Sequence, residues 1–264
     1  MAYSKEWVEL LNTIRDFQDS NEYTWFRGMI DCDFKLNSGL YREEKVSDLS
    51  TYISTERFRY ELFRRMGYMH IKEDEWNLLF LMQHFRVGTR LLDWSESFAV
   101  ALYFALDNAE PDKDGVIWML DPLSLNELSR DKRAFFTPRN AYTKYMEKAM
   151  KEDDLEVGIF ANSLALYPMR NSSRIVAQHG MFTLQGTAGV PLEDEHNGKL
   201  IEQGILKKVL IKREMREDAE AFLKQSGISS FSMFPDLEGL AKYINKEGYR
   251  KKNDKDAVDT VGEE

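Results

Sequence analysis

The spacing of apolar residues predicts two helices in the first part of the chain. Between residues 4 and 18, apolar side chains recur every three or four positions, the period of an amphipathic helix. They are Trp7, Val8, Leu11, Ile14 and Phe17. Residues 98–106, FAVALYFAL, are apolar on every side of a helix. A helix without a polar face is buried all round, so we expect this one at the centre of the fold.

Short apolar runs between turn residues predict strands. The run YTWFRGM predicts a short strand that ends at Gly28. TRLL at residues 89–92 is another predicted strand, and we expect the polar segment DWSES that follows it to cap the central helix. GVIWML at residues 115–120 is bounded by Gly115 and Pro122. The other predicted strands are two segments within residues 172–186 that meet near Gln-His-Gly, and KKVLIKR at residues 207–213.

The rest of the chain reads as helices and loops. Helices are predicted at residues 48–68, 73–85, 216–227 and 234–248, and residues 123–160 read as helical or irregular. Gly227 closes one of these helices and Pro235 with Asp236 begins another. The sequence therefore predicts a single mixed α+β domain over residues 1–249. Residues 250–264 are highly charged and lack aromatic residues, so we expect a disordered tail.

Composition narrows the class of protein. The net charge of −9 argues against a protein that binds nucleic acid mainly by neutralising phosphates, although a local basic groove such as RFRYELFRR remains open. The single cysteine, Cys32, excludes an internal disulfide and indicates a reducing compartment. The chain has no signal-like start and no apolar run long enough to span a bilayer. We therefore expect a cytoplasmic protein that does not bind membranes.

Three polar clusters interrupt apolar surroundings, and they carry the candidate chemistry. They are WFRG at residues 25–28, QHFRVGTRLLDWS at 83–95 and RIVAQHG at 174–180. A lone arginine in an apolar strand needs an acceptor, and Asp93 could supply it to Arg27 in a structural ion pair. The four histidines lack metal-ligand spacing, and the phosphate-loop, dinucleotide and hydrolase motifs are absent. We therefore expect no metal.

At this point the residues resemble a known family. WFRGM with LNSGLYR, MQHFRVGTRLLDWSESFAVALYFA, SRIVAQHGMFTL and GISSFSMFPDLEGLAKYI resemble the successive signature segments of the FRG domain family, named for the Phe-Arg-Gly that begins here at Phe26. The resemblance runs in order from about residue 20 to residue 245. Met29 stands where the family usually has Gln, and Gly88 where it usually has Pro.

A second resemblance, to the layout of ADP-ribosyltransferases, implies a function. In that layout an early strand ends in Arg, a strand with Thr or Ser runs directly into a helix, and a late strand carries Glu or Gln. The resemblance implies a small split β-sheet whose three strands line a cleft for NAD, the substrate. Arg27 would match the first-strand residue that holds NAD. Thr89, with Ser95 as second choice, would match the second-strand hydroxyl, and Gln178 the third-strand residue.

The chemistry of NAD is compatible with these residues. A guanidinium recognises pyrophosphate bidentately, and the helix start at residues 95–97 would offer free N–H groups to an anion. Trp94 and Trp25 could stack on a ring, and Asp93 is the nearest carboxylate that could stabilise an oxocarbenium-like state. The resemblance implies four catalytic candidates, Arg27, Thr89, Asp93 and Gln178. The NAD-binding candidates are Arg27, Gly28, Gln83, His84, Thr89, Arg90, Trp94 and Ser95.

Structural roles remain open for most of these residues. Thr89 could fill a strand, Gln83 and His84 could fix a loop, and Trp94 could belong to the core. The expected function is ADP-ribosyl transfer to a protein or nucleic acid, in the setting of a bacterial toxin or antiphage effector with a possible antitoxin or chaperone. The alternatives are NAD hydrolysis and a non-catalytic module that binds a nucleotide or a partner.

Overall fold

Six strands pair into one antiparallel sheet in the computed structural model, in the order β4-β5-β2-β1-β3-β6. The structure describes residues 2–42, 49–73, 75–110, 112–137, 161–170, 172–187 and 189–245. The strands are β1 (Trp25–Met29), β2 (Leu91–Ser95), β3 (Gly115–Leu120), β4 (Leu164–Leu166), β5 (Gly180–Leu184) and β6 (Leu206–Ile211). The predicted α+β class is therefore confirmed.

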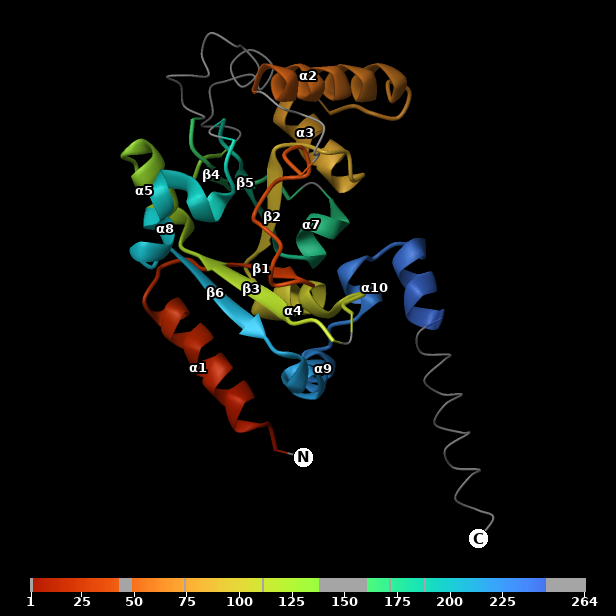
Figure 1. Ribbon diagram of the computed structural model, residues 1–264. Helices are drawn as coiled ribbons and strands as arrows, with labels where there is room; N and C mark the ends of the chain where they lie inside the picture. The colour runs from red at the N-terminus through yellow and green to blue at the C-terminus, as the bar shows by residue number, and fades with distance from the viewer. Residues whose placement is uncertain are drawn as a thin grey trace.

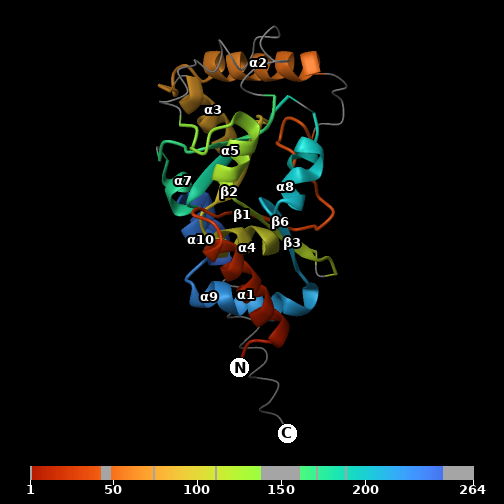
Figure 2. The same ribbon diagram turned by 90° about the vertical axis from the view of Figure 1, so that its left-hand side faces the viewer.

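Helices cover both faces of the sheet. The α-helices are α1 (Lys5–Asp19), α2 (Leu49–Met66), α3 (Glu75–His84), α4 (Phe98–Leu106), α5 (Pro122–Arg130), α7 (Ser173–Ala177), α8 (Lys199–Glu202), α9 (Arg216–Gln225) and α10 (Ser230–Met233). Two 3₁₀ segments are η2 (Leu192–Gly198) and η3 (Arg213–Met215), and residues 237–245 are also helical. Figures 1 and 2 show α2 and α3 at the opposite end of the molecule from α1 and α9. Within the described residues, no helix is long and apolar enough to cross a membrane.

Helix α4 lies at the centre, as its all-round apolar sequence predicts. Ser97 caps it, with its hydroxyl accepting from the Val100 N–H, and the helix packs against β1 together with α1 and α9. Gly28 makes the approach possible, since a Cβ at this position would overlap the carbonyl oxygen of Ala101. The absence of a side chain at Gly28 thus fixes how closely α4 sits against β1, the strand that carries Arg27.

The two halves of the sheet meet at a narrow junction. Strands β1 and β3 pair at five positions, from Trp25 with Leu120 to Met29 with Val116. By contrast β1 and β2, both fully described, pair at one position, Phe26 with Ser95. The junction between β1 and β2 is therefore the least bonded part of the sheet, and it lies between two of the predicted site segments.

Three local predictions are wrong. The segment RIVA forms helix α7 rather than a strand, because Ser172 caps it by accepting from the Ile175 N–H. Thr89 precedes β2 instead of belonging to it, and Val8 is 44% exposed while Leu10 is buried. Strand β4 and helix α10 are present without having been predicted. The predicted tail at residues 250–264 and most of residues 123–160 lie outside the described residues.

A buried polar cluster links the loops at the β4 and β5 end. Glu195 is 1% exposed, and its carboxylate accepts from the Ser163 N–H at 2.8 Å and the Ser163 hydroxyl at 2.7 Å. Burial raises the pKa of Glu195 to about 7, and hydrogen bonds from Ser163 and Gly186 only partly oppose this. The protonated form is therefore favoured in the folded state relative to the unfolded chain.

We expect Gly28→Ala to destabilise the fold by about 3 kcal/mol, because the added methyl must displace the backbone of α4. Urea unfolding followed by circular dichroism would measure the loss. Gly180→Ala is the matched control, since its Cβ would meet the Ile175 carbonyl oxygen at an ordinary 3.5 Å. Equal stability of the two variants would contradict the close packing of α4 on β1.

Glu195 should make the protein lose stability as pH rises. The folded pKa of about 7 lies above that of an unfolded glutamate, so this contribution is present in full below about pH 4.5 and is lost as pH rises through 7. The melting temperature of Glu195→Gln should therefore change less between pH 5 and 8 than that of the unsubstituted protein. Parallel pH profiles for the two proteins would show that Glu195 does not titrate as proposed.

Candidate functional site

A small hollow beside β2 brings together five of the residues that the sequence predicts for the site. Its enclosed volume is about 40 Å³. It is lined by Phe80, Gln83, His84, Asp93, Trp94, Arg174, Ile175, Gln178, Gly180, Met181 and Phe182, from α3, β2, α7 and β5. Gln83, His84, Asp93, Trp94 and Gln178 are the five predicted residues. The hollow can enclose one small group, so most of a ligand as large as a dinucleotide would lie outside it.

Arg27 lies next to this hollow and spans the junction between β1 and β2. Its Nη1 donates to the backbone carbonyl of Asp93 at 2.6 Å and lies 4.0 Å from the Asp93 carboxylate. The side chain is 15% exposed, and its Nε is buried without a partner among the described residues. Burial lowers the pKa of Arg27 to about 10, which Asp93 partly opposes and Arg42 reinforces. The predicted contact between Arg27 and Asp93 is therefore present. It consists of a hydrogen bond to the Asp93 backbone carbonyl and a longer contact with the Asp93 carboxylate.

The Asp93 carboxylate is exposed at the rim of the hollow and is held by an amide. Its side chain is 57% exposed, and Oδ2 accepts from Nε2 of Gln83 at 2.8 Å. The Thr89 hydroxyl donates to Oε1 of Gln83 at 2.7 Å and accepts from the Leu91 N–H at 3.0 Å. Because Thr89 supplies the donor for Oε1, the Gln83 NH₂ group is directed at Asp93. Thr89 and Gln83 therefore orient the carboxylate.

Thr89, Ser95 and Arg90 are buried rather than placed on the surface of the hollow. Thr89 has no exposed surface, and the Ser95 hydroxyl, 4% exposed, donates to the backbone carbonyl of Gln178 at 2.7 Å. Arg90 is 1% exposed and pairs through Nε with Glu56 at 2.7 Å. In this conformation the three side chains bond to other groups of the protein, and their predicted contacts with a ligand stay predictions.

Both tryptophans predicted to stack on a ring belong to the core. Trp25 is fully buried and stacks on Phe135, with 5.6 Å between ring centroids. Trp94 is 3% exposed and donates from its indole nitrogen to the Thr183 hydroxyl at 3.0 Å. Gly28 faces α4 and has a packing role. The aromatic and glycine residues therefore shape the walls of the site.

The start of α4 offers fewer free N–H groups than the sequence suggests. The N–H of Glu96 donates to the carbonyl of His179, and the N–H of Ser97 donates to the Ser95 hydroxyl. The prediction that residues 95–97 present unpaired N–H groups to an anion is therefore wrong for these two amides.

Gln178 lies just before β5, at the end of α7, and its side chain is already engaged. Its Nε2 donates to the carbonyl of Met233 in α10 at 3.0 Å. Strand β5 itself reads GMFTL, and Phe182 is the residue opposite Asp93. No carboxylate therefore projects from β5, and Asp93 is the carboxylate that lines the hollow.

His84 contributes an unpaired nitrogen. Its Nδ1 is buried without a partner among the described residues. Burial lowers the pKa of His84, the nearby Arg174 lowers it further, and Asp236 opposes both. The neutral form of His84 is therefore favoured over the charged form more strongly than in a free imidazole.

Arg174 is a site residue that the sequence interpretation missed. It lines the hollow, and its Nη1 donates to the carbonyl of His84 at 3.1 Å. The sequence pattern predicts a strand at this position and does not fix the direction of the Arg174 side chain. The signal in the sequence that could have revealed Arg174 is the serine pair before it, which can begin a short helix.

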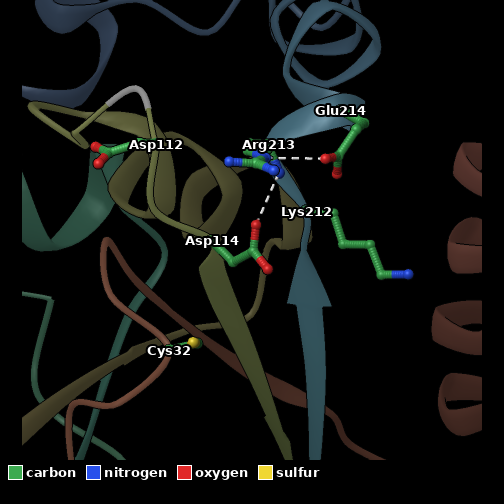
Figure 3. A pocket seen from close by; sticks show the side chains of 6 residues that line it. All are labelled: Cys32, Asp112, Asp114, Lys212, Arg213 and Glu214. Carbon is green, nitrogen blue, oxygen red and sulfur yellow. Dashed lines mark hydrogen bonds and ion pairs between the residues drawn. The ribbon is translucent and has the colours of Figure 1, made fainter.

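A second, wider hollow lies elsewhere in the molecule, and its arginine is already paired with one of its carboxylates. It has a volume of about 580 Å³ and is lined by Cys32, Asp112, Asp114, Lys212, Arg213 and Glu214 (Figure 3). The Arg213 N–H donates to Asp114 at 3.0 Å, and its Nε donates to Glu214 at 2.9 Å. Asp31, Cys32 and Asp33 could bring ligand atoms together, yet Asp31 is already paired with Lys113 at 2.8 Å. This region therefore does not point to a ligand or a metal.

We expect Thr89→Val to destabilise the protein by about 1–3 kcal/mol, because it removes the partners of two polar groups. Thr89→Ser keeps the hydroxyl and should retain most of the stability. In a double-mutant cycle measured by urea unfolding, Gln83→Leu should cost less in the Thr89→Val background than alone. Strict additivity would show that Thr89 does not act through Gln83.

Comparison with known proteins gives a partial family assignment. Residues 22–114 match the model of the FRG domain, and this range holds β1, Gln83, Asp93 and α4. The similar segments at residues 173–184 and 227–244 lie outside the match, so the extension of the domain to about residue 245 stays a prediction. No curated protein and no solved structure matches the chain at a significant level. The chain therefore contains an FRG domain, matched over residues 22–114.

Proposed function

We propose that the protein is an ADP-ribosyltransferase-like enzyme that uses NAD as substrate and modifies a macromolecule. One observation carries the proposal: Arg27 of β1 and Asp93 of β2 meet at the weakly paired junction of the sheet, beside an open hollow. Strands β1, β2 and β5 are also neighbours in the sheet, which is the layout that the resemblance implies for the three strands of an NAD cleft.

The polar groups at this junction fit the parts of NAD. Arg27 is a guanidinium held in place, and it keeps a buried Nε without an acceptor, as a residue that awaits an anion would. Asp93 offers an exposed carboxylate to ribose hydroxyls and to the positive charge of the nicotinamide ring. Gln83 and Thr89 keep that carboxylate in one orientation, which limits the reorganisation needed when a substrate binds.

The reaction would break the bond between C1′ of the ribose and the nicotinamide nitrogen. Nicotinamide leaves with the bonding electrons, and the ribose passes through an oxocarbenium-like state whose positive charge Asp93 stabilises. A nucleophile of the acceptor then bonds to C1′, and its proton passes to the exposed Asp93 carboxylate. Because the Asp93 side chain is more than half exposed, the acceptor can reach this point from solvent.

The biological setting is part of the same proposal. The resemblance favours a bacterial toxin or antiphage effector in the cytoplasm, acting on a protein or nucleic acid, with an antitoxin or chaperone as a possible partner. NAD hydrolysis is the closest alternative, since water could replace the acceptor at the same exposed position.

A non-catalytic binding module is the second candidate, and one specific observation favours it. The side chain at the expected third-strand position, Gln178, is an amide that is already bonded to Met233. No acidic residue stands on β5. A protein that has lost this chemistry would keep the hollow for recognition of a nucleotide or a partner.

Nicotinamide release from NAD by the purified protein tests the proposal. We expect Asp93→Asn to reduce release about 100-fold, because the amide keeps the shape and the Gln83 contact but lacks the charge. Asp16→Asn, on the exposed side of α1, removes the same charge elsewhere and should leave release unchanged.

Labelled NAD separates the alternatives. Label on a macromolecule in the presence of lysate supports transfer, whereas free ADP-ribose alone supports hydrolysis. The enzymatic proposal fails if a folded, unsubstituted protein releases no nicotinamide with or without lysate.

A further inference from the structure

Arg174 is an arginine in the wall of the hollow, and within the described part of the chain no carboxylate pairs with it directly. It comes from α7, which lies between α3 and α10 in both views (Figures 1 and 2). Its guanidinium donates to the carbonyl of His84, and its central carbon lies 4.8 Å from the centre of the Phe234 ring. Among the described residues, no carboxylate oxygen lies within 4.0 Å of this guanidinium.

Two other buried or partly exposed arginines have direct carboxylate partners. Arg90 is buried against Glu56 at 2.7 Å, and the exposed Arg170 pairs with Glu96 at 3.1 Å. Desolvation of a cation is costly unless an anion compensates it directly. Arg174 is stabilised by a carbonyl oxygen and an aromatic ring in place of a carboxylate. A position for an anion therefore remains beside it.

Charged groups of both signs lie around Arg174. Burial lowers the pKa of Arg174, and Arg86 lowers it further. Asp93, Asp236 and Glu238 oppose this from a longer distance. None of these three carboxylates lies within ion-pair distance of the Arg174 guanidinium, whose one hydrogen bond to the described residues is the one to the carbonyl of His84.

We infer that the hollow is a phosphate subsite in which Arg174 binds a phosphate of a nucleotide, while Asp93, which lines the same hollow, accepts hydrogen bonds from its ribose. The small enclosed volume of about 40 Å³ suits one compact group better than a base. Ile175, Met181 and Phe182 provide apolar walls that strengthen a charged hydrogen bond. The identity of the nucleotide as NAD rests on the proposed function, whereas the anion subsite itself does not.

The positions of the two arginines and Asp93 also indicate where the phosphates and the ribose of the ligand would lie. Asp93 lies 4.0 Å from Arg27 and lines the same hollow as Arg174, so the carboxylate has a cation near it on β1 and another on α7. A ligand with a pyrophosphate beside a ribose can place anionic oxygens at the arginines and hydroxyls at Asp93. Inorganic pyrophosphate has no hydroxyl groups for Asp93, so it should bind more weakly than ADP-ribose.

Isothermal titration calorimetry with ADP-ribose and with inorganic pyrophosphate tests the subsite. Arg174→Met keeps an apolar stem against Phe234 but removes the charge, and it should weaken the binding of both probes about tenfold or more. Arg174→Lys should retain part of the affinity, since it keeps the charge and loses the planar donors. Near-ultraviolet circular dichroism and melting temperature would establish that each variant is folded.

Arg170→Met is the matched control. It removes one positive charge from the segment preceding α7, at a residue that pairs with Glu96 and does not line the hollow. Its affinity for ADP-ribose should equal that of the unsubstituted protein within twofold. If Arg170→Met and Arg174→Met lose the same affinity for ADP-ribose, the loss follows from net charge alone and the subsite is overturned.

The remaining outcomes separate the subsite from the enzymatic proposal. Binding of ADP-ribose that depends on Arg174, without any turnover of NAD, supports the subsite and removes the transferase. Turnover of NAD with an unchanged KM in Arg174→Met supports the enzyme and overturns the subsite. The subsite is also overturned if neither ADP-ribose nor pyrophosphate binds to the unsubstituted protein.

Discussion

The hydrogen bond from Arg27 to the Asp93 carbonyl joins the two halves of the molecule. Strands β1 and β2 pair at one position, and the arginine side chain bridges them where that pairing ends. On one side, Gly28 lets α4 press against β1. On the other, β2 carries Asp93 toward α3 and α7. The geometry of the candidate site therefore depends on a guanidinium that is largely withdrawn from water.

Polar groups near this junction divide into those that build the site and those that face a ligand. Thr89, Ser95 and Arg90 are buried and bonded internally, so they support the structure. Asp93 and Arg174 face the hollow and keep hydrogen-bonding capacity. The buried groups hold the few exposed groups in fixed orientations, as a binding site requires.

Sequence reasoning predicts the elements with long and regular patterns and fails where partners are distant. The helices at Lys5–Asp19 and Phe98–Leu106 follow directly from apolar spacing. The segment RIVA was misassigned because a short helix rich in β-branched residues has the pattern of a strand. Arg27 and Arg90 have similar apolar surroundings in sequence, yet only the fold brings Glu56 to Arg90. The direction of Arg174 likewise follows from α7, which local sequence did not reveal.

Direct observation of the arginine side chains would test the central claim that this junction binds a nucleotide. In an NMR titration with ADP-ribose, the account predicts that the Nε–Hε signals of Arg27 and Arg174 shift together, while those of Arg90 and Arg213 stay in place. Shifts confined to Arg213, in the wider hollow of Figure 3, or an absence of shifts at Arg27 and Arg174 would contradict it.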